Sequence, residues 1–137
     1  MKDPIHITAP DKQRLDDLLA EVEATDPRLW NDLKPLVEEL QRAVVVHPRE
    51  IAGDIITMNS RAELLDLANG ETVTFTLVFP PEANVDEERI SILAPIGAGM
   101  LGYRVGDEFK WPVPQGVRRM KVTRIDYQPE AAGGFNR

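Results

Sequence analysis

The sequence predicts an α+β protein in which a short helical hairpin precedes a mostly antiparallel sheet that carries one short helix. Three observations support this fold class. Apolar residues recur at helical spacing before residue 50. β-Branched and aromatic residues dominate several segments after that point. Pro95 then opens a run of small residues between two predicted strands. We place a boundary at residue 50, with a hairpin domain over 1–50 and a sheet domain over 51–137.

The first helix is predicted to begin after Thr8 and to end near Ala24. Thr8 can cap the helix, and Asp11 favours the positive end of the helix dipole. The sequence 25–27 contains a proline and ends the helix. The apolar stripe consists of Leu15, Leu18, Leu19 and Val22.

A second apolar stripe predicts a helix that Asp32 caps and that continues to Val44. Pro35 is tolerated because it falls in the first turn. The two stripes match, so we expect an antiparallel coiled-coil hairpin. At 1.5 Å per residue, each helix is a rod of only about 20 Å.

The sheet region is read from alternating apolar residues and turn signals. Asn69 and Gly70 form the strongest hairpin turn signal in the chain. The tail over residues 128–137, with two glycines and two alanines, is expected to be loosely ordered. We predict strands at 55–58, 61–67, 72–79, 89–93, 108–111 and 117–127, a short helix at 95–101 and a turn at 113–116.

Composition limits the classes of function. The chain has a formal net charge of −7 and no cysteine, so disulfides and thiolate zinc sites are excluded. Because residues 1–99 are net acidic and the remainder net basic, docking onto a large charged protein assembly is one interpretation and simple solvation of both faces is the other. Duplex DNA is disfavoured as a direct partner. We expect a cytoplasmic protein that does not associate with membranes and needs no cofactor.

Two groups of charged residues are candidates for a site. Glu23 and Asp26 lie three positions apart near the hairpin tip and are the plausible pair of carboxylates for Mg²⁺, although a solvated helix face is the favoured interpretation. A basic cluster on the last strand and on its predicted partner strand, which carries Lys110, suits nucleic acid, an acidic protein surface or protection of a sheet edge. It consists of Lys110, Arg118, Arg119, Lys121 and Arg124. Nothing in these groups predicts a catalytic residue or a metal site.

Five segments carry a resemblance to known proteins. Residues 92–102, 105–107 and 114–117 resemble the C-terminal domain of the Gre transcript cleavage factors. Residues 54–61 and 127–133 resemble the Rnk family, named as regulators of nucleoside diphosphate kinase. The resemblance implies an FKBP-like sheet domain that docks beside the secondary channel of bacterial RNA polymerase. In Gre factors a longer hairpin enters that channel, and its D-x-x-E carboxylates help to hold a catalytic Mg²⁺.

The resemblance also implies which residues contact the polymerase. Ala94, Pro95, Ile96 and Gly97 match the exposed turn of the family. The sequence departs from the Gre pattern at the hairpin, which is short and lacks a glutamate at the required offset after Asp26. We therefore expect a non-enzymatic regulator that competes with Gre-type factors at the channel rim and influences nucleoside diphosphate kinase levels. It would meet nucleic acid only through the polymerase complex. The alternatives are a transcript cleavage factor and a direct protein regulator of nucleoside diphosphate kinase.

Overall fold

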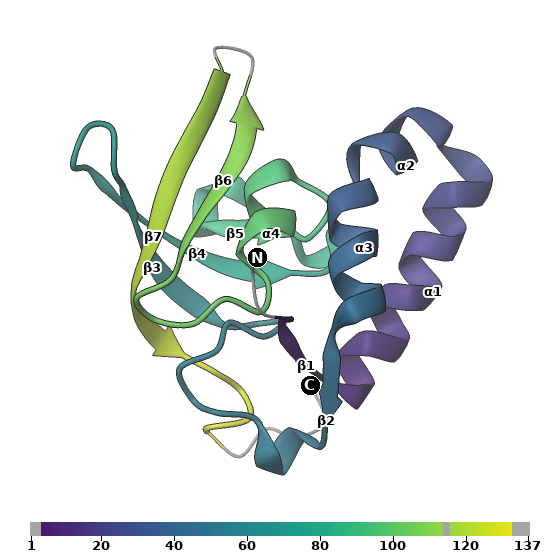
Figure 1. The fold of residues 1–137 in the computed structure, drawn as a ribbon, viewed down its shortest axis with the longest axis horizontal. Coiled ribbons are helices and arrows are strands. Elements are labelled where there is room, and N and C mark those ends of the chain that lie inside the picture. The colour runs from purple at the N-terminus through teal and green to yellow at the C-terminus, as the bar shows by residue number, and fades with distance from the viewer. Residues whose placement is uncertain (1–3, 114–115, 133–137) are drawn as a thin grey trace.

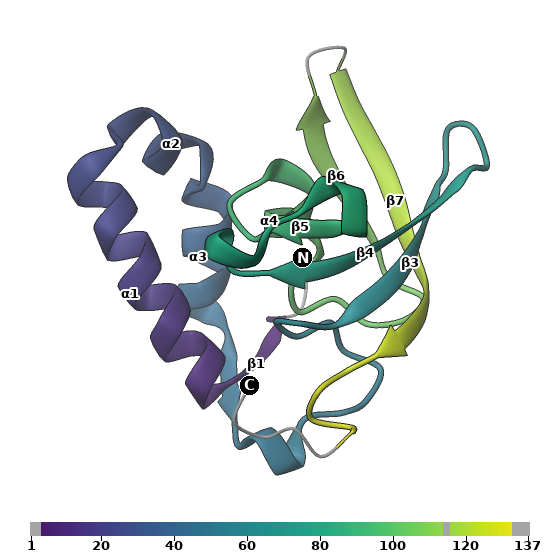
Figure 2. The same cartoon turned by 180° about the vertical axis from the view of Figure 1, so that it is seen from behind.

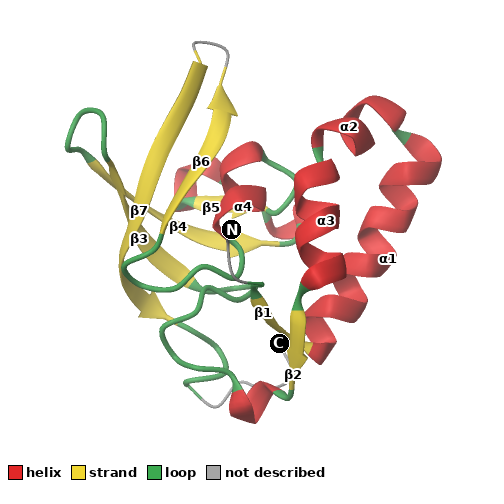
Figure 3. Ribbon diagram, viewed as in Figure 1, coloured by secondary structure: helices red, strands yellow, loops and turns green. Residues whose placement is uncertain are grey.

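The structure is a computed structural model that describes residues 4–113 and 116–132. Three helices gather on one side of the molecule, and a curled sheet occupies the other side (Figure 1). Colouring by secondary structure separates the same two regions (Figure 3). The predicted α+β class is confirmed.

The sheet has five strands in the order β5-β4-β3-β7-β6. It is a mixed sheet, because β4 and β5 are parallel while the other three neighbouring pairs are antiparallel. The predicted turn at 113–116 includes residues 114 and 115, which lie outside the described residues. The strands are β3 (Arg61–Asp66), β4 (Thr72–Val78), β5 (Arg89–Ser91), β6 (Glu108–Val113) and β7 (Gly116–Tyr127).

The predicted turn between β3 and β4 is confirmed. The N–H of Gly70 donates to the carbonyl of Asp66, and the N–H of Asp66 donates to the carbonyl of Glu71, both at 2.8 Å. The carboxylate of Asp66 accepts the N–H of Ala68 at 2.9 Å. That hydrogen bond, followed by the one from Arg118, holds the pKa of Asp66 below its ordinary value.

The first helix, α1 (Ala9–Thr25), begins as the sequence predicts and ends within a residue of the predicted end. The hydroxyl of Thr8 accepts the N–H of Asp11 at 3.3 Å and caps the first turn. At the other end, the N–H of Asp26 donates to the carbonyl of Val22 at 2.8 Å. Local signals therefore suffice to define this helix.

The second predicted helix is divided into α2 (Pro27–Asp32) and α3 (Lys34–Arg42). Asp32 is the last residue of α2, so the prediction that it caps the following helix is wrong. The carboxylate of Asp26 accepts the N–H of Leu29 at 3.1 Å and starts a helical turn directly after α1. The connection is consequently helical rather than a loop. Figures 1 and 2 show α1 and α3 running side by side in opposite directions.

The end of the second predicted helix is also corrected, because Val44 is in a strand. β2 (Val44–Val46) pairs in parallel with β1 (His6–Thr8). The N–H of Val44 donates to the carbonyl of Ile5 at 2.9 Å. Three consecutive valines favour a strand over a helix. The two strands join the entry of α1 to the exit of α3 and close the helical segment at its base.

The helices and the sheet share one hydrophobic cluster. The guanidinium of Arg14 in α1 also lies over the Phe79 ring after β4, at 3.8 Å from the ring centroid. The helices are thus packed onto the sheet, and the domain boundary at residue 50 stays a prediction. The cluster includes Leu15, Leu19, Leu36 and Leu40 from the helices and Leu64, Leu77, Met120 and Val122 from the sheet.

Two further predictions are wrong because of contacts between distant residues. Residues 55–58 are buried, but Ile55 forms only an isolated bridge with Arg104 rather than a strand. The beginning of the tail is firmly held, because the side-chain amide of Gln128 donates to the carbonyls of Ala52 and Ile55 at 2.8 Å each. The FKBP-like description and the coiled-coil packing stay predictions.

Gly102 sets a close approach between the N-terminal segment and the loop after α4 (Pro95–Met100). Its φ is +83°, and a Cβ placed there would lie 2.5 Å from the Cβ of Ile5. Gly106 has a similar φ of +96°, but a Cβ there would meet nothing within 4 Å. A substitution at Gly106 therefore tests backbone strain alone, whereas one at Gly102 tests backbone strain together with the steric conflict at Ile5.

We predict that Gly102→Ala lowers the free energy of unfolding by about 3 kcal/mol, since left-handed backbone strain and overpacking both act. Gly106→Ala should cost about 1 kcal/mol, from backbone strain alone. Urea unfolding of the two variants measures both values. Equal losses would contradict the tight packing of Ile5 on this loop.

Candidate functional site

The helix α4 is positioned by a compact turn after β5. The hydroxyl of Ser91 accepts the N–H of Leu93, and its carbonyl accepts the N–H of Ala94, both at 3.0 Å. Pro95 then occupies the first turn of the helix, where its missing N–H is harmless. The turn therefore holds Pro95 in a defined place, where its side chain is exposed.

The four residues predicted to bind the polymerase differ in what they offer a partner. Pro95 is exposed, whereas Ala94 and Ile96 are half-buried. Gly97 is buried, and a Cβ placed there would lie 2.2 Å from the carbonyl oxygen of Ser91. Glycine at 97 thus lets α4 lie close against β5. A partner can reach Pro95 and the exposed parts of Ala94 and Ile96, and the role of this surface in binding stays a prediction.

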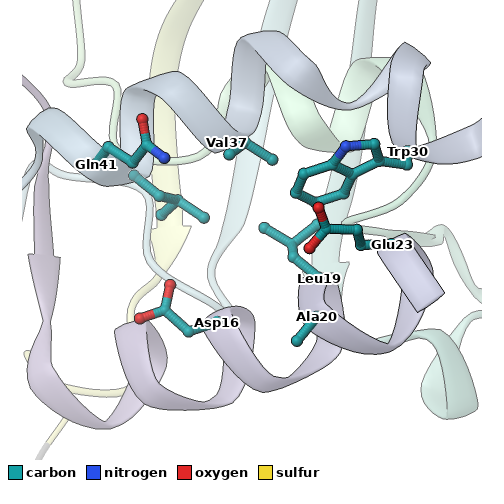
Figure 4. Close-up of a pocket in the computed structure, with 8 residues that line it drawn as sticks. Asp16, Leu19, Ala20, Glu23, Trp30, Val37 and Gln41 are labelled. Atoms are coloured by element: carbon teal, nitrogen blue, oxygen red, sulfur yellow. The ribbon is translucent and has the colours of Figure 1, made fainter.

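The two acidic residues of the predicted hairpin tip have separate surroundings. Asp26 uses its carboxylate to cap α2, as described above. Glu23 lines a groove between the helices, where it lies beside Trp30 (Figure 4). In the described ranges 4–113 and 116–132, no group of three or more His, Asp or Glu side chains is arranged to hold a metal ion. The solvated helix face stays the favoured interpretation of this pair, and a shared metal site stays the alternative.

The three arginines of the basic cluster lie on β7 and form ion pairs with acidic neighbours on the sheet. The arginine side chains of the Arg119 and Arg124 pairs are well exposed, so each of these pairs adds little to stability. They nevertheless lower the net positive charge of the strand, which weakens the interpretation as a nucleic-acid surface. The ion pairs are Arg118 with Asp66, Arg119 with Glu108, and Arg124 with Glu63 and Asp126.

A buried polar cluster at the base of the hairpin was not predicted from the sequence. The carboxylate of Asp11 accepts the N–H of Met58 at 3.2 Å. The hydroxyl of Thr57 donates to the carboxylate of Glu130 at 2.7 Å, and the N–H of Thr57 donates to the hydroxyl of Ser60 at 2.9 Å. These contacts join α1, the 57–60 turn and the segment after β7.

Asp11 is 1% exposed, which makes it costly to ionise. Burial raises the pKa of Asp11 to about 7, and the negative charge of Glu130 acts in the same direction. The N–H of Met58, the hydroxyl of Thr8 and the charge of Arg14 act in the opposite direction. From the sequence we predict only that Asp11 interacts favourably with the dipole of α1. Its hydrogen bond with Met58 joins residues 47 positions apart, so no local pattern indicates it.

Comparison with known proteins places these features in a family. Residues 51–127 match the family model described as the C-terminal region of the transcription elongation factors GreA and GreB. A solved structure described as a prokaryotic transcription elongation factor GreA/GreB from Nitrosomonas europaea superimposes with a TM-score of 0.72 at 38% identity. The match covers 90% of this chain and 99% of that one. The fold and the α4 region thus define a protein of the GreA/GreB type.

Two curated relatives narrow the assignment. The regulator of nucleoside diphosphate kinase of Escherichia coli strain K12 is 43% identical over 98 residues, which are 71% of this chain and 72% of that protein. The transcription elongation factor GreA of Nautilia profundicola is 37% identical over 93 residues, which are 68% of this chain and 57% of that protein. The chain therefore belongs to the Rnk family of regulators of nucleoside diphosphate kinase, which shares the GreA/GreB C-terminal domain.

The relatives are named as regulators and elongation factors, not as enzymes. Within the part of the chain that the structure describes, no helix has the length and apolar character of a membrane span.

The buried Asp11 predicts that stability depends on pH. An unfolded Asp has its ordinary pKa of 3.8, whereas burial raises the pKa of the folded Asp11 to about 7. Because the folded state binds the extra proton in this interval, the free energy of unfolding should fall as the pH rises from about 4 to about 7, by roughly 4 kcal/mol.

The variant Asp11→Asn should remove most of this slope, since the amide has the same shape and does not titrate there. Chemical unfolding at several pH values measures the slope. The exposed Asp17→Asn is the control and should retain it. An unchanged slope in Asp11→Asn would show that another group titrates.

Proposed function

We propose that the protein is a non-enzymatic regulator that binds bacterial RNA polymerase near its secondary channel and modulates transcription elongation. It would compete with Gre-type factors without cleaving the transcript. The observation that carries this proposal is the GreA/GreB-type domain over residues 51–127, which presents an exposed Pro95 on a rigidly held turn. The polymerase is the partner that the resemblance to Gre factors implies.

We call the surface of Ala94, Pro95 and Ile96 the polymerase anchor. The geometry of the α4 turn supports a binding role for this surface. Hydrogen bonds to Ser91 and the close packing at Gly97 fix this turn before any partner binds. A surface that is already ordered loses little conformational entropy on association. Pro95 lies at the centre of this surface, and its apolar side chain would be removed from water when a partner binds.

The hairpin supports binding without transcript cleavage. α1 has 17 residues and α3 has nine, so their lengths are about 25 Å and 14 Å. The arm is shorter than the arm that the resemblance attributes to Gre factors. In addition, Asp26 caps α2 and Glu23 faces the groove, so neither carboxylate is set out for a shared ion. The arm would occupy the channel mouth and leave the reaction centre untouched.

The name of the Escherichia coli relative favours a link to nucleoside diphosphate kinase as well. We propose that this link is indirect and arises from altered transcription. Direct binding to the kinase is the alternative. The two are separated by offering purified kinase to the immobilised protein, which should retain none under an indirect mechanism.

The anchor is tested by retention of bacterial core RNA polymerase on the immobilised protein. Pro95→Asp should weaken retention at least tenfold, because a buried charge would replace an apolar contact. Aspartate is favourable in the first helical turn, so α4 should stay folded. Pro81→Asp, at an exposed proline in the helical turn Pro80–Glu82, is the matched control and should bind as the parent does. Equal binding of parent and Pro95→Asp would reject the anchor.

The cleavage alternative is tested on a backtracked elongation complex. We expect no Mg²⁺-dependent shortening of the transcript beyond the rate of the polymerase alone. A protein-dependent increase that disappears in Glu23→Gln/Asp26→Asn would overturn the non-enzymatic assignment. Asparagine at 26 is chosen because it retains the helix cap.

A further inference from the structure

A groove lies between α1 and α3, and Trp30 of α2 lines one end of it (Figure 4). Its volume is about 170 Å³. Pockets for drug-sized molecules usually start at about 300 Å³, so this groove matches a single large side chain better. It is separate from the α4 turn, and the proposed function does not use it.

The floor of the groove is apolar. Leu19 and Leu40 are almost fully buried beneath it, while Val37 and Trp30 are half-buried and keep apolar surface open to a partner. Ala20 lies in the middle of the α1 wall and ends at its Cβ, which leaves the groove open there. Covering this exposed apolar surface with a partner removes it from water and contributes favourable free energy to binding.

The α1 wall is acidic. Asp16 and Glu23 are seven residues apart, so they lie on one face of α1 about 10 Å apart, on either side of Ala20. Asp16 pairs with Lys12 at 2.7 Å, but both groups are solvent-accessible, and such a pair is readily exchanged for another cation. Trp30 adds an aromatic surface next to Glu23.

We propose that this groove binds a basic side chain, arginine in particular, that a helical or extended segment of a partner protein presents. The methylene groups would lie over Leu19, Ala20 and Val37, and the guanidinium would lie between the Glu23 carboxylate and the Trp30 ring. Arginine suits this environment because its planar head pairs with carboxylates and stacks on aromatic rings.

Charge decides among the possible occupants. Two carboxylates on one wall repel nucleic acid and acidic peptides. The chain has a formal net charge of −7, so two copies repel each other and a second copy is disfavoured as the source of the cation. A basic segment of a different protein is the occupant that remains.

The probe is a synthetic helical peptide with arginines seven positions apart on a leucine and alanine face. The isotope-labelled 137-residue chain is titrated with it, and the indole N–H signal of Trp30, assigned with Trp30→Phe, reports binding. We expect saturable binding that shifts this signal. A peptide with glutamine in place of arginine should bind about tenfold more weakly.

Two variants and two matched controls locate the site. Asp16→Asn/Glu23→Gln should weaken peptide binding about tenfold, while Asp17→Asn/Glu21→Gln removes the same charge from α1 outside the groove and should change it less than twofold. Ala20→Leu should block the groove with equal effect, and the exposed Ala24→Leu should not.

Equal losses in the two charge variants would mean general attraction to an acidic helix and would overturn the proposal. Binding unchanged by Ala20→Leu would do so as well. Self-association of the chain that Ala20→Leu abolishes would assign the groove to a second copy instead. Circular dichroism of every variant shows whether a loss reflects unfolding, and the charge variants test the site even if Ala20→Leu fails to fold.

Discussion

The carboxyl group of Asp11 determines how the helices are joined to the sheet. It is buried at the start of α1 and accepts the backbone N–H of Met58 from the turn that precedes β3. Thr8, Thr57, Ser60 and Glu130 surround it with further polar groups. Burying a carboxyl group is unfavourable, and the hydrogen bond recovers part of that cost. The direction of α1 is therefore set at its first turn, and the helical hairpin is part of the packed structure.

This attachment explains how two different surfaces can coexist on a small protein. The GreA/GreB-type sheet carries the hydrogen-bonded α4 turn, whereas the three helices carry an acidic groove. The insertion of α2 between α1 and α3 forms the closed end of that groove, and the carboxylate of Asp26 starts α2. Compared with a simple two-helix hairpin, the tip has a groove that Trp30 of α2 helps to line, and the carboxylate of Asp26 is engaged in capping α2. The shape of the tip thus follows from one capping residue.

Features specified by neighbouring residues were predictable from the sequence. The cap at Thr8, the turn at Gly70 and the proline that opens α4 each depend on contacts within a few positions. The irregular course of residues 55–58 and the docking of Gln128 were not predictable, because they depend on partners 49 to 76 positions away in the chain. The candidate site divides in the same way. Pro95 was found by motif, but the groove depends on how three helices come together.

The parallel pair of β1 and β2 has a structural consequence of its own. It ties residue 6 to residue 44 and residue 8 to residue 46, so the 35 residues between Thr8 and Val44 form a closed excursion from the sheet. Because the two ends of this segment stay the same distance apart, whole helical turns added at the tip, around α2, would leave the β1–β2 pair and the packing of Leu15 and Leu40 unchanged. The β1–β2 pair in this way separates the reach of the arm from the folding of the sheet on which it stands.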